Sequence, residues 1–132
     1  MIYQVLHAGI SVGNMDEALE WYQKNLDFEL VRDNYMPPLG ARVCFVKNGD
    51  FQLELFQHDR PNPIPEERLT PNSDLQTIGT KHVAFAVPDM KAQKAKFLAN
   101  GVDIAHEVSM GGMSIMFVRD NSGVLIELIE RK

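Results

Sequence analysis

The chain has 132 residues, enough for one compact domain with a hydrophobic core and too few for a multidomain protein. Hydrophobic residues make up 45% of it and charged residues 23%, which excludes a disordered, collagen-like or disulfide-stapled chain. The formal net charge of -5, spread without a basic run, argues against nucleic acid or an anionic membrane as the main partner, so we expect a small molecule or another protein.

The same order of predicted elements occurs twice along the chain. In the first half, hydrophobic patterning predicts a strand over 7–12, a helix over 15–26, and strands over 28–32, 41–47 and 51–57. In the second half it predicts a strand over 82–87, a helix over 90–100, and strands over 102–108, 114–119 and 124–130. Each half therefore has the element order βαβββ, and the chain is predicted to contain two copies of one structural unit.

Local signals support these boundaries. Asn14 and Asp89 can cap the two helices, and Gly101 can end the second one. Turn residues at 48–50 and 120–123 predict the last hairpin of each half. The predicted fold class is therefore α+β, with two tandem βαβββ modules.

A proline-rich segment separates the two halves. Four prolines between residues 61 and 71 suit neither a helix interior nor a central strand. We therefore expect one domain made of module one at 1–58, a linker or flap at 59–78, and module two at 79–132. A connection of this length inside a compact domain is often functional.

The cysteine content and the distribution of apolar residues indicate the cellular compartment. The single cysteine, Cys44, cannot form an internal disulfide and lies in a predicted strand, so we interpret it as a structural thiol. The N-terminus lacks the cationic and apolar regions of a secretory signal, and no stretch of about 18 apolar residues occurs. A reduced cytoplasmic protein without a membrane partner is expected.

Strand alternation selects four side chains in the repeat. Side chains on a strand point alternately to opposite faces, so each strand has a face for the helix and a second face. His7 and His82 lie on the second face of the first strand of each half, followed there by small residues. Glu54 and Glu127 interrupt the apolar last strands at equivalent places. The pattern predicts that these four residues face one shared point.

A divalent transition metal would explain these residues. A carboxylate placed between leucines is costly to bury unless a cation compensates it. Two imidazoles and two carboxylates supply four N/O ligands with a total charge of -2, which suits Zn, Ni, Co, Mn or Fe(II) better than Ca or Mg. A lone strand histidine is more often a hydrogen-bonded core residue, but the duplication favours a metal site.

Four segments of the chain carry a family resemblance: His7-Ala8-Gly9-Ile10-Ser11-Val12, Trp21-Tyr22 with Leu26-Asp27-Phe28-Glu29-Leu30, His82-Val83-Ala84-Phe85-Ala86-Val87 and Asp120-Asn121-Ser122-Gly123-Val124-Leu125-Ile126-Glu127-Leu128. With them the chain resembles the vicinal oxygen chelate superfamily, which includes glyoxalase I, methylmalonyl-CoA epimerase, extradiol dioxygenases, fosfomycin-resistance enzymes and bleomycin-binding proteins. The resemblance extends from the first strand to the C-terminus, apart from the proline-rich connection, and it implies that the two modules form a curved sheet around a metal cavity.

The resemblance implies that His7, Glu54, His82 and Glu127 are the metal ligands, one metal per site. It also implies that Glu127 or Glu54 acts as general base beside a metal-bound carbonyl, in a glyoxalase I-like lyase or isomerase. Proteins of this size in the superfamily often pair, so we expect a homodimer with two sites, whose ligands lie within one chain or are shared between subunits.

One departure argues against glutathione dependence. Glyoxalase I typically has an arginine four residues beyond its first-strand ligand, where it binds a glutathione carboxylate. Ser11 occupies that position here, and Ala86 occupies the matching one in the second half. Cations elsewhere could reach an anionic group, although solvated surface charge explains each of them as well: Arg42, Lys47, Lys81 and Arg119.

Three other functions stay open. An Fe(II) ring-cleaving dioxygenase would use His7, His82 and Glu127 as ligands, but the fourth candidate ligand, Glu54, favours proton transfer. A drug- or metabolite-binding protein of the bleomycin-resistance type normally lacks the ligands, so their retention argues against it. A thiol transferase acting on an epoxide also remains, because fold alone does not decide function.

Overall fold

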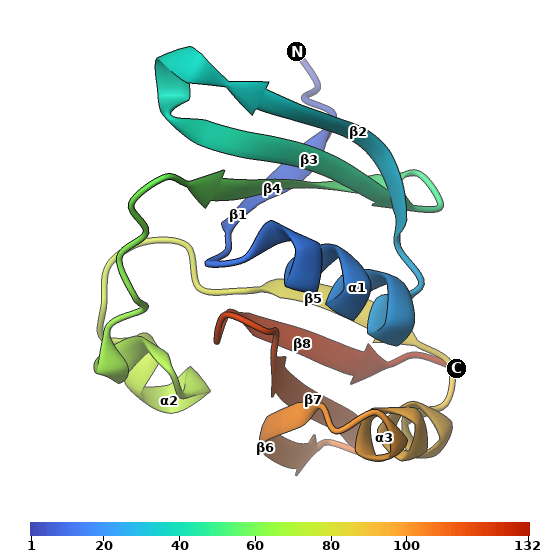
Figure 1. The fold of residues 1–132 in the computed structure, drawn as a ribbon. Coiled ribbons are helices and arrows are strands. Elements are labelled where there is room, and N and C mark those ends of the chain that lie inside the picture. Colours follow the sequence, from blue (N-terminus) through green and yellow to red (C-terminus); the bar gives the residue numbers. More distant parts are fainter. The chain divides into compact units, whose positions relative to one another are not determined.

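The computed structural model describes residues 1–132 and divides into two compact units, Met1–Pro63 and Ile64–Lys132. Each unit contains one four-stranded mixed sheet and one long helix, as the repeat predicted (Figure 1).

The first unit has the predicted βαβββ order. Its sheet has the strand order β1-β4-β3-β2, with β1 parallel to β4 and the other pairs antiparallel. The elements are β1 (His7–Ser11), α1 (Met15–Leu26), β2 (Glu29–Met36), the short 3-10 helix η1 (Pro37–Leu39), β3 (Ala41–Asn48) and β4 (Phe51–His58).

The second unit repeats this topology after a short additional segment. Its sheet has the order β5-β8-β7-β6, with β5 parallel to β8. The elements are η2 (Glu66–Arg68), α2 (Pro71–Asp74), β5 (Val83–Val87), α3 (Met90–Ala99), β6 (Asp103–Met110), β7 (Met113–Arg119) and β8 (Leu125–Glu130). None of the helices combines the length and the hydrophobicity that a membrane-spanning helix needs.

Both long helices begin where the capping residues predicted. The Asn14 side chain accepts a hydrogen bond from the Glu17 N–H at 3.1 Å, and the Asp89 side chain accepts one from the Ala92 N–H at 2.9 Å. Such caps satisfy backbone donors that have no partner inside the helix.

In each unit the strand that comes last along the chain forms a hydrogen bond with the first residue of the long helix. The Gln57 side chain on β4 accepts a hydrogen bond from the Met15 N–H, and Glu130 on β8 accepts one from the Met90 N–H at 3.2 Å. These equivalent contacts fix each helix to the strand that carries a candidate glutamate, which leaves the opposite face of the sheet uncovered by that helix.

The core lies between each helix and the inner face of its own sheet. In the first unit, Met15 and Tyr22 of α1 are fully buried together with Leu53 and Leu55 of β4. In the second unit, fully buried residues include Phe97 of α3 and Ile126 and Leu128 of β8. Burying these side chains stabilises the fold by roughly 1.5–3 kcal/mol each, and it fixes which face of each sheet points away from the helix.

Two strands carry a bulge that the sequence pattern did not predict. The register of β2 against β3 shifts between Leu30 and Arg32, and that of β6 against β7 shifts between Ile104 and His106. An extra residue at a bulge reverses the alternation of side chains after it. The strand expected at 28–32 also continues to Met36, with the bulge in its first half.

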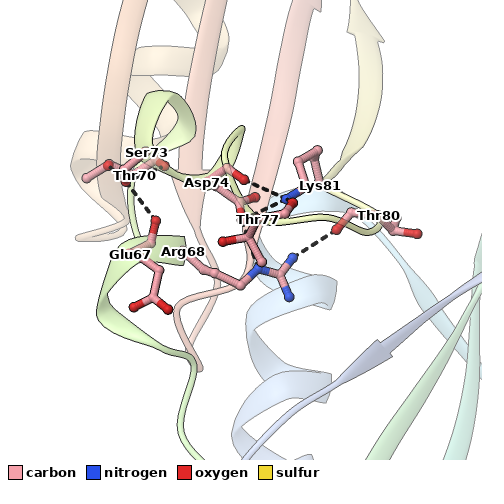
Figure 2. A network of polar contacts seen from close by, with 8 residues as sticks. All are labelled: Glu67, Arg68, Thr70, Ser73, Asp74, Thr77, Thr80 and Lys81. Carbon is pink, nitrogen blue, oxygen red and sulfur yellow. Dashed lines mark hydrogen bonds and ion pairs between the residues drawn. The ribbon is translucent and has the colours of Figure 1, made fainter.

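The proline-rich segment is partly helical and belongs to the second unit from Ile64 onward. Figure 2 shows its polar network around the buried Asp74, whose carboxylate accepts hydrogen bonds from Arg68 Nε at 2.8 Å and Lys81 Nζ at 3.2 Å. Lys81 also donates to the backbone carbonyls of Asp74 and Thr77. The segment is therefore held against the residues that precede β5.

Candidate functional site

The first unit brings its predicted histidine and glutamate together. His7 lies on β1 and Glu54 on the neighbouring parallel strand β4, where Gly9 is the register partner of Glu54. His7 Nε2 and Glu54 Oε2 are 3.8 Å apart, and both side chains are partly exposed. Both lie on the face of the sheet opposite the buried Leu53 and Leu55, as the alternation predicted.

The second unit repeats this arrangement. His82 immediately precedes β5, and Glu127 on β8 has Ala84 as its register partner. His82 Nε2 and Glu127 Oε2 are 2.8 Å apart, and both side chains are again partly exposed. Each unit therefore places one imidazole nitrogen and one carboxylate next to each other, on a sheet face away from its own helix.

A phenylalanine on the adjoining strand packs on each histidine. Phe45 of β3 pairs with Glu54, and its ring lies edge-on to the His7 ring with centroids 5.4 Å apart. Phe117 of β7 has the equivalent position beside Glu127, with its ring 5.0 Å from His82. Such contacts orient the imidazole and keep part of its surface dry.

The sequence patterns did not identify these two phenylalanines as neighbours of the histidines. Phe45 and Phe117 occupy equivalent places in the third strand of each half, so aligning the repeats beyond the ligand strands would have found them. They were overlooked because a strand phenylalanine usually packs in the core.

The sequence also failed to identify Arg32. The bulge in β2 makes Arg32 the register partner of Phe45, and its guanidinium carbon lies 4.8 Å from the centre of the Phe45 ring. Simple alternation from Leu30 would have placed Arg32 on the helix side of the sheet. In the second unit the equivalent position beside Phe117 is His106.

Three of the four cations that were considered for an anionic group have structural partners instead. Lys81 binds Asp74, as described above. Arg119 pairs with Asp103 at 3.0 Å and donates to the Leu69 carbonyl.

The third of these cations joins three elements of the first unit. Arg42 on β3 makes two hydrogen bonds to Asp33 of β2 and one to Asp16 of α1. The hydrogen bonds from Arg42 lower the pKa of the Asp33 carboxyl below its ordinary value. Because Arg42 lies on the helix side, it is directed away from the face that carries His7.

The donor atoms suit a transition metal, but neither unit supplies a complete set alone. An imidazole nitrogen and a carboxylate oxygen are ligands typical of Zn and related metals. No group of three or more histidine, cysteine, aspartate or glutamate side chains gathers as a potential metal site. Each pair therefore has the composition of half of the four-ligand set expected from the sequence.

Comparison with known proteins identifies similar chains over nearly the full length. The model of the Glyoxalase/Bleomycin resistance protein/Dioxygenase superfamily matches residues 4–128. A lactoylglutathione lyase of Haemophilus influenzae is 30% identical, with 98% of this chain and 93% of that protein aligned.

Solved structures show the same fold. A glyoxalase family protein from Enterococcus faecalis superposes with a TM-score of 0.81 at 24% identity, covering 96% of this chain and 97% of the other. The trypanothione-dependent glyoxalase I of Leishmania major gives a TM-score of 0.76 at 25% identity, covering 98% and 87% of the two chains. The α+β fold of two βαβββ modules expected from the sequence is confirmed.

Proposed function

Because the chain belongs to the Glyoxalase/Bleomycin resistance protein/Dioxygenase superfamily, we propose that it is a metal-dependent enzyme of the glyoxalase I type. It would act as a lyase or isomerase that moves a proton next to a metal-bound carbonyl of a small substrate. The observation that carries this proposal is the repeated histidine, glutamate and phenylalanine arrangement, present in both units on corresponding strands.

In this proposal His7, Glu54, His82 and Glu127 hold one divalent transition metal: Ni, Zn, Co, Mn or Fe. The two pairs lie in separate units, so a four-ligand site needs both of them, from one chain or from two copies. When bound, such an ion acts as a Lewis acid that polarises a carbonyl and stabilises the negative charge left by loss of a proton.

The residues of the chain would supply the remaining chemistry. Glu127 or Glu54 would accept the proton from the carbon next to the carbonyl as a general base and then return it as a general acid. Return to the same carbon would give an epimerase; return to the carbonyl carbon would give an isomerase, in which the hydroxyl proton of the first carbon passes to the former carbonyl oxygen. Phe45 and Phe117 cover one side of the imidazoles and limit access of water to them. We favour Glu127 as the base, with Glu54 as the other candidate.

Metal analysis tests the ligand set directly. We expect the purified protein to contain stoichiometric divalent metal by mass spectrometry, and His82→Ala to lose most of it because one of four ligands is missing. His58→Ala is the matched control, since His58 is an exposed histidine whose Nδ1 accepts a hydrogen bond from the Arg60 N–H. Equal metal content in the His82→Ala and wild-type proteins would refute this site.

Proton transfer is tested by isotope exchange in deuterium oxide. Lactoylglutathione is the first substrate to try, because similar proteins are named lactoylglutathione lyases. Ser11 replaces the arginine expected to bind glutathione, so a second carbonyl substrate without glutathione is tested beside it. Glu127→Gln should keep the bound metal and lose most of the exchange if Glu127 is the base, whereas Glu54→Gln should then retain more activity. The reverse order would assign the base to Glu54.

The same preparations separate the alternative functions. Oxygen uptake with a catechol by the Fe(II)-loaded protein would favour a ring-cleaving dioxygenase. Absence of bound metal, together with tight binding of an apolar drug, would favour a binding protein of the bleomycin-resistance type.

We also propose a homodimer. Several large apolar side chains are more than half exposed in the single chain, and on the first unit they include Ile2, Val5, Leu6, Leu30 and Tyr35. Exposed apolar surface of this kind is typical of protein contacts. Light scattering after gel filtration should give twice the monomer mass, and a monomer at micromolar concentration would contradict the proposal.

A further inference from the structure

A straight row of side chains crosses the sheet of the first unit beside the candidate metal ligands. Arg32 pairs with Phe45, Phe45 with Glu54, and Glu54 with Gly9, so these four residues occupy one line across four strands. Register partners point to the same face of a sheet. The row therefore places a guanidinium, an aromatic ring and a carboxylate on the face that also carries His7.

Arg32 is an unpaired cation on this face. Its guanidinium lies over the Phe45 ring at 4.8 Å and has no hydrogen bond or ion pair with any side chain or carbonyl. Arg42, Arg68 and Arg119 all have carboxylate partners. A guanidinium that lies over a ring without a hydrogen-bond partner has N–H groups available to bind a carboxylate, which it can do with two parallel hydrogen bonds.

The two units differ at this end of the row. His106 takes the equivalent position beside Phe117, whereas the histidine, glutamate and phenylalanine are repeated. The planar cation is thus a feature of the first unit alone. An anionic group bound along the first unit's row would therefore meet a permanently charged partner at the Arg32 end. The corresponding row of the second unit has no such partner at His106.

We propose that Arg32 binds a carboxylate of the substrate and so fixes its orientation at the His7–Glu54 pair. This inference rests on the function proposed above, and it makes Arg32 a residue that positions the substrate. Arg32 is two strands away from Glu54, and its guanidinium lies over the ring of Phe45 on the strand between them. The substrate carboxylate would therefore lie beside Phe45, while the reacting part of the substrate extends toward the His7–Glu54 pair.

A charge-matched ligand pair tests this inference. Hexanoate and its uncharged analogue hexanamide are titrated into the ¹⁵N-labelled protein as purified, at low ionic strength, while backbone and arginine Nε–H shifts are followed. We expect hexanoate to bind more tightly than hexanamide and to shift the Arg32 signal. Arg32→Gln should weaken hexanoate binding about tenfold or more, since it removes a charge-assisted pair of hydrogen bonds, and leave hexanamide unchanged.

Two further variants make the result specific. Arg32→Lys keeps the charge without the planar fork and should recover only part of the preference. Arg60→Gln removes another exposed arginine of the first unit and should behave as wild type. Arg32 is itself exposed, so circular dichroism should show unchanged folding in each variant.

The outcomes separate this inference from the proposed function. It is overturned if wild type shows no preference for hexanoate, or if Arg32→Gln keeps the preference, as it would if the carboxylate bound the metal. His82→Ala should lose metal and still show the Arg32-dependent preference. A protein without metal that keeps this preference would instead refute the proposed metal chemistry alone.

Discussion

Replacing Asp74 by asparagine should destabilise the protein by about 2 kcal/mol. The Asp74 side chain is 2% exposed and contacts Arg68 and Lys81, whose side chains are 35% and 20% exposed. Removing one partner of a fully buried ion pair costs about 3–5 kcal/mol. Because both cations here retain contact with water and with backbone carbonyls, we expect a smaller loss.

Urea denaturation at pH 7 measures this loss, with Asp103→Asn as the matched control. Asp103 also pairs with an arginine, Arg119, but its side chain is 61% exposed, so its substitution should cost less than about 0.5 kcal/mol. If Asp74→Asn lowered the free energy of unfolding no more than Asp103→Asn, the proposed role of the buried network would be wrong.

The same comparison has a predicted pH dependence. Burial alone would raise the pKa of Asp74, but hydrogen bonds from Arg68 and Lys81 outweigh it, so the pKa lies below the ordinary value of 3.8. A carboxyl whose pKa is lower in the folded state stabilises that state above its unfolded pKa and loses this effect as pH falls through the folded value. The stability difference between wild type and Asp74→Asn should be constant near neutrality and shrink below about pH 4.

Three smaller predictions concern single residues. Burial, with a hydrogen bond to a neighbouring aspartate, raises the pKa of the Cys44 thiol to about 11, so a thiol reagent at pH 8 should label it only after unfolding. Asp89→Ala removes the cap of α3 and should cost about 1 kcal/mol in thermal or urea unfolding. Gly123→Ala should destabilise more than Gly49→Ala: both have positive φ, but only at Gly123 would the new Cβ meet Leu69, at 3.2 Å, and equal losses would contradict this packing.

The sequence by itself determined the repeated βαβββ order, both helix starts and the pairing of each histidine with a glutamate. These features depend on interactions over a few residues or on strict alternation along one strand. Asn14 and Asp89 mark the helix starts because a capping side chain reaches only the next two or three N–H groups. That His7 meets Glu54 follows once two adjacent strands point their alternate residues to the same face.

Only the tertiary structure decided the surroundings of these pairs. The position of Arg32 depends on a bulge, which is set by how β2 pairs with β3 and leaves no periodic signal in the sequence. Likewise, Asp74 is unremarkable in a proline-rich segment until folding buries it beside Lys81. Both outcomes arise from contacts between separate segments, because register and desolvation are properties of the packed chain that no local pattern encodes.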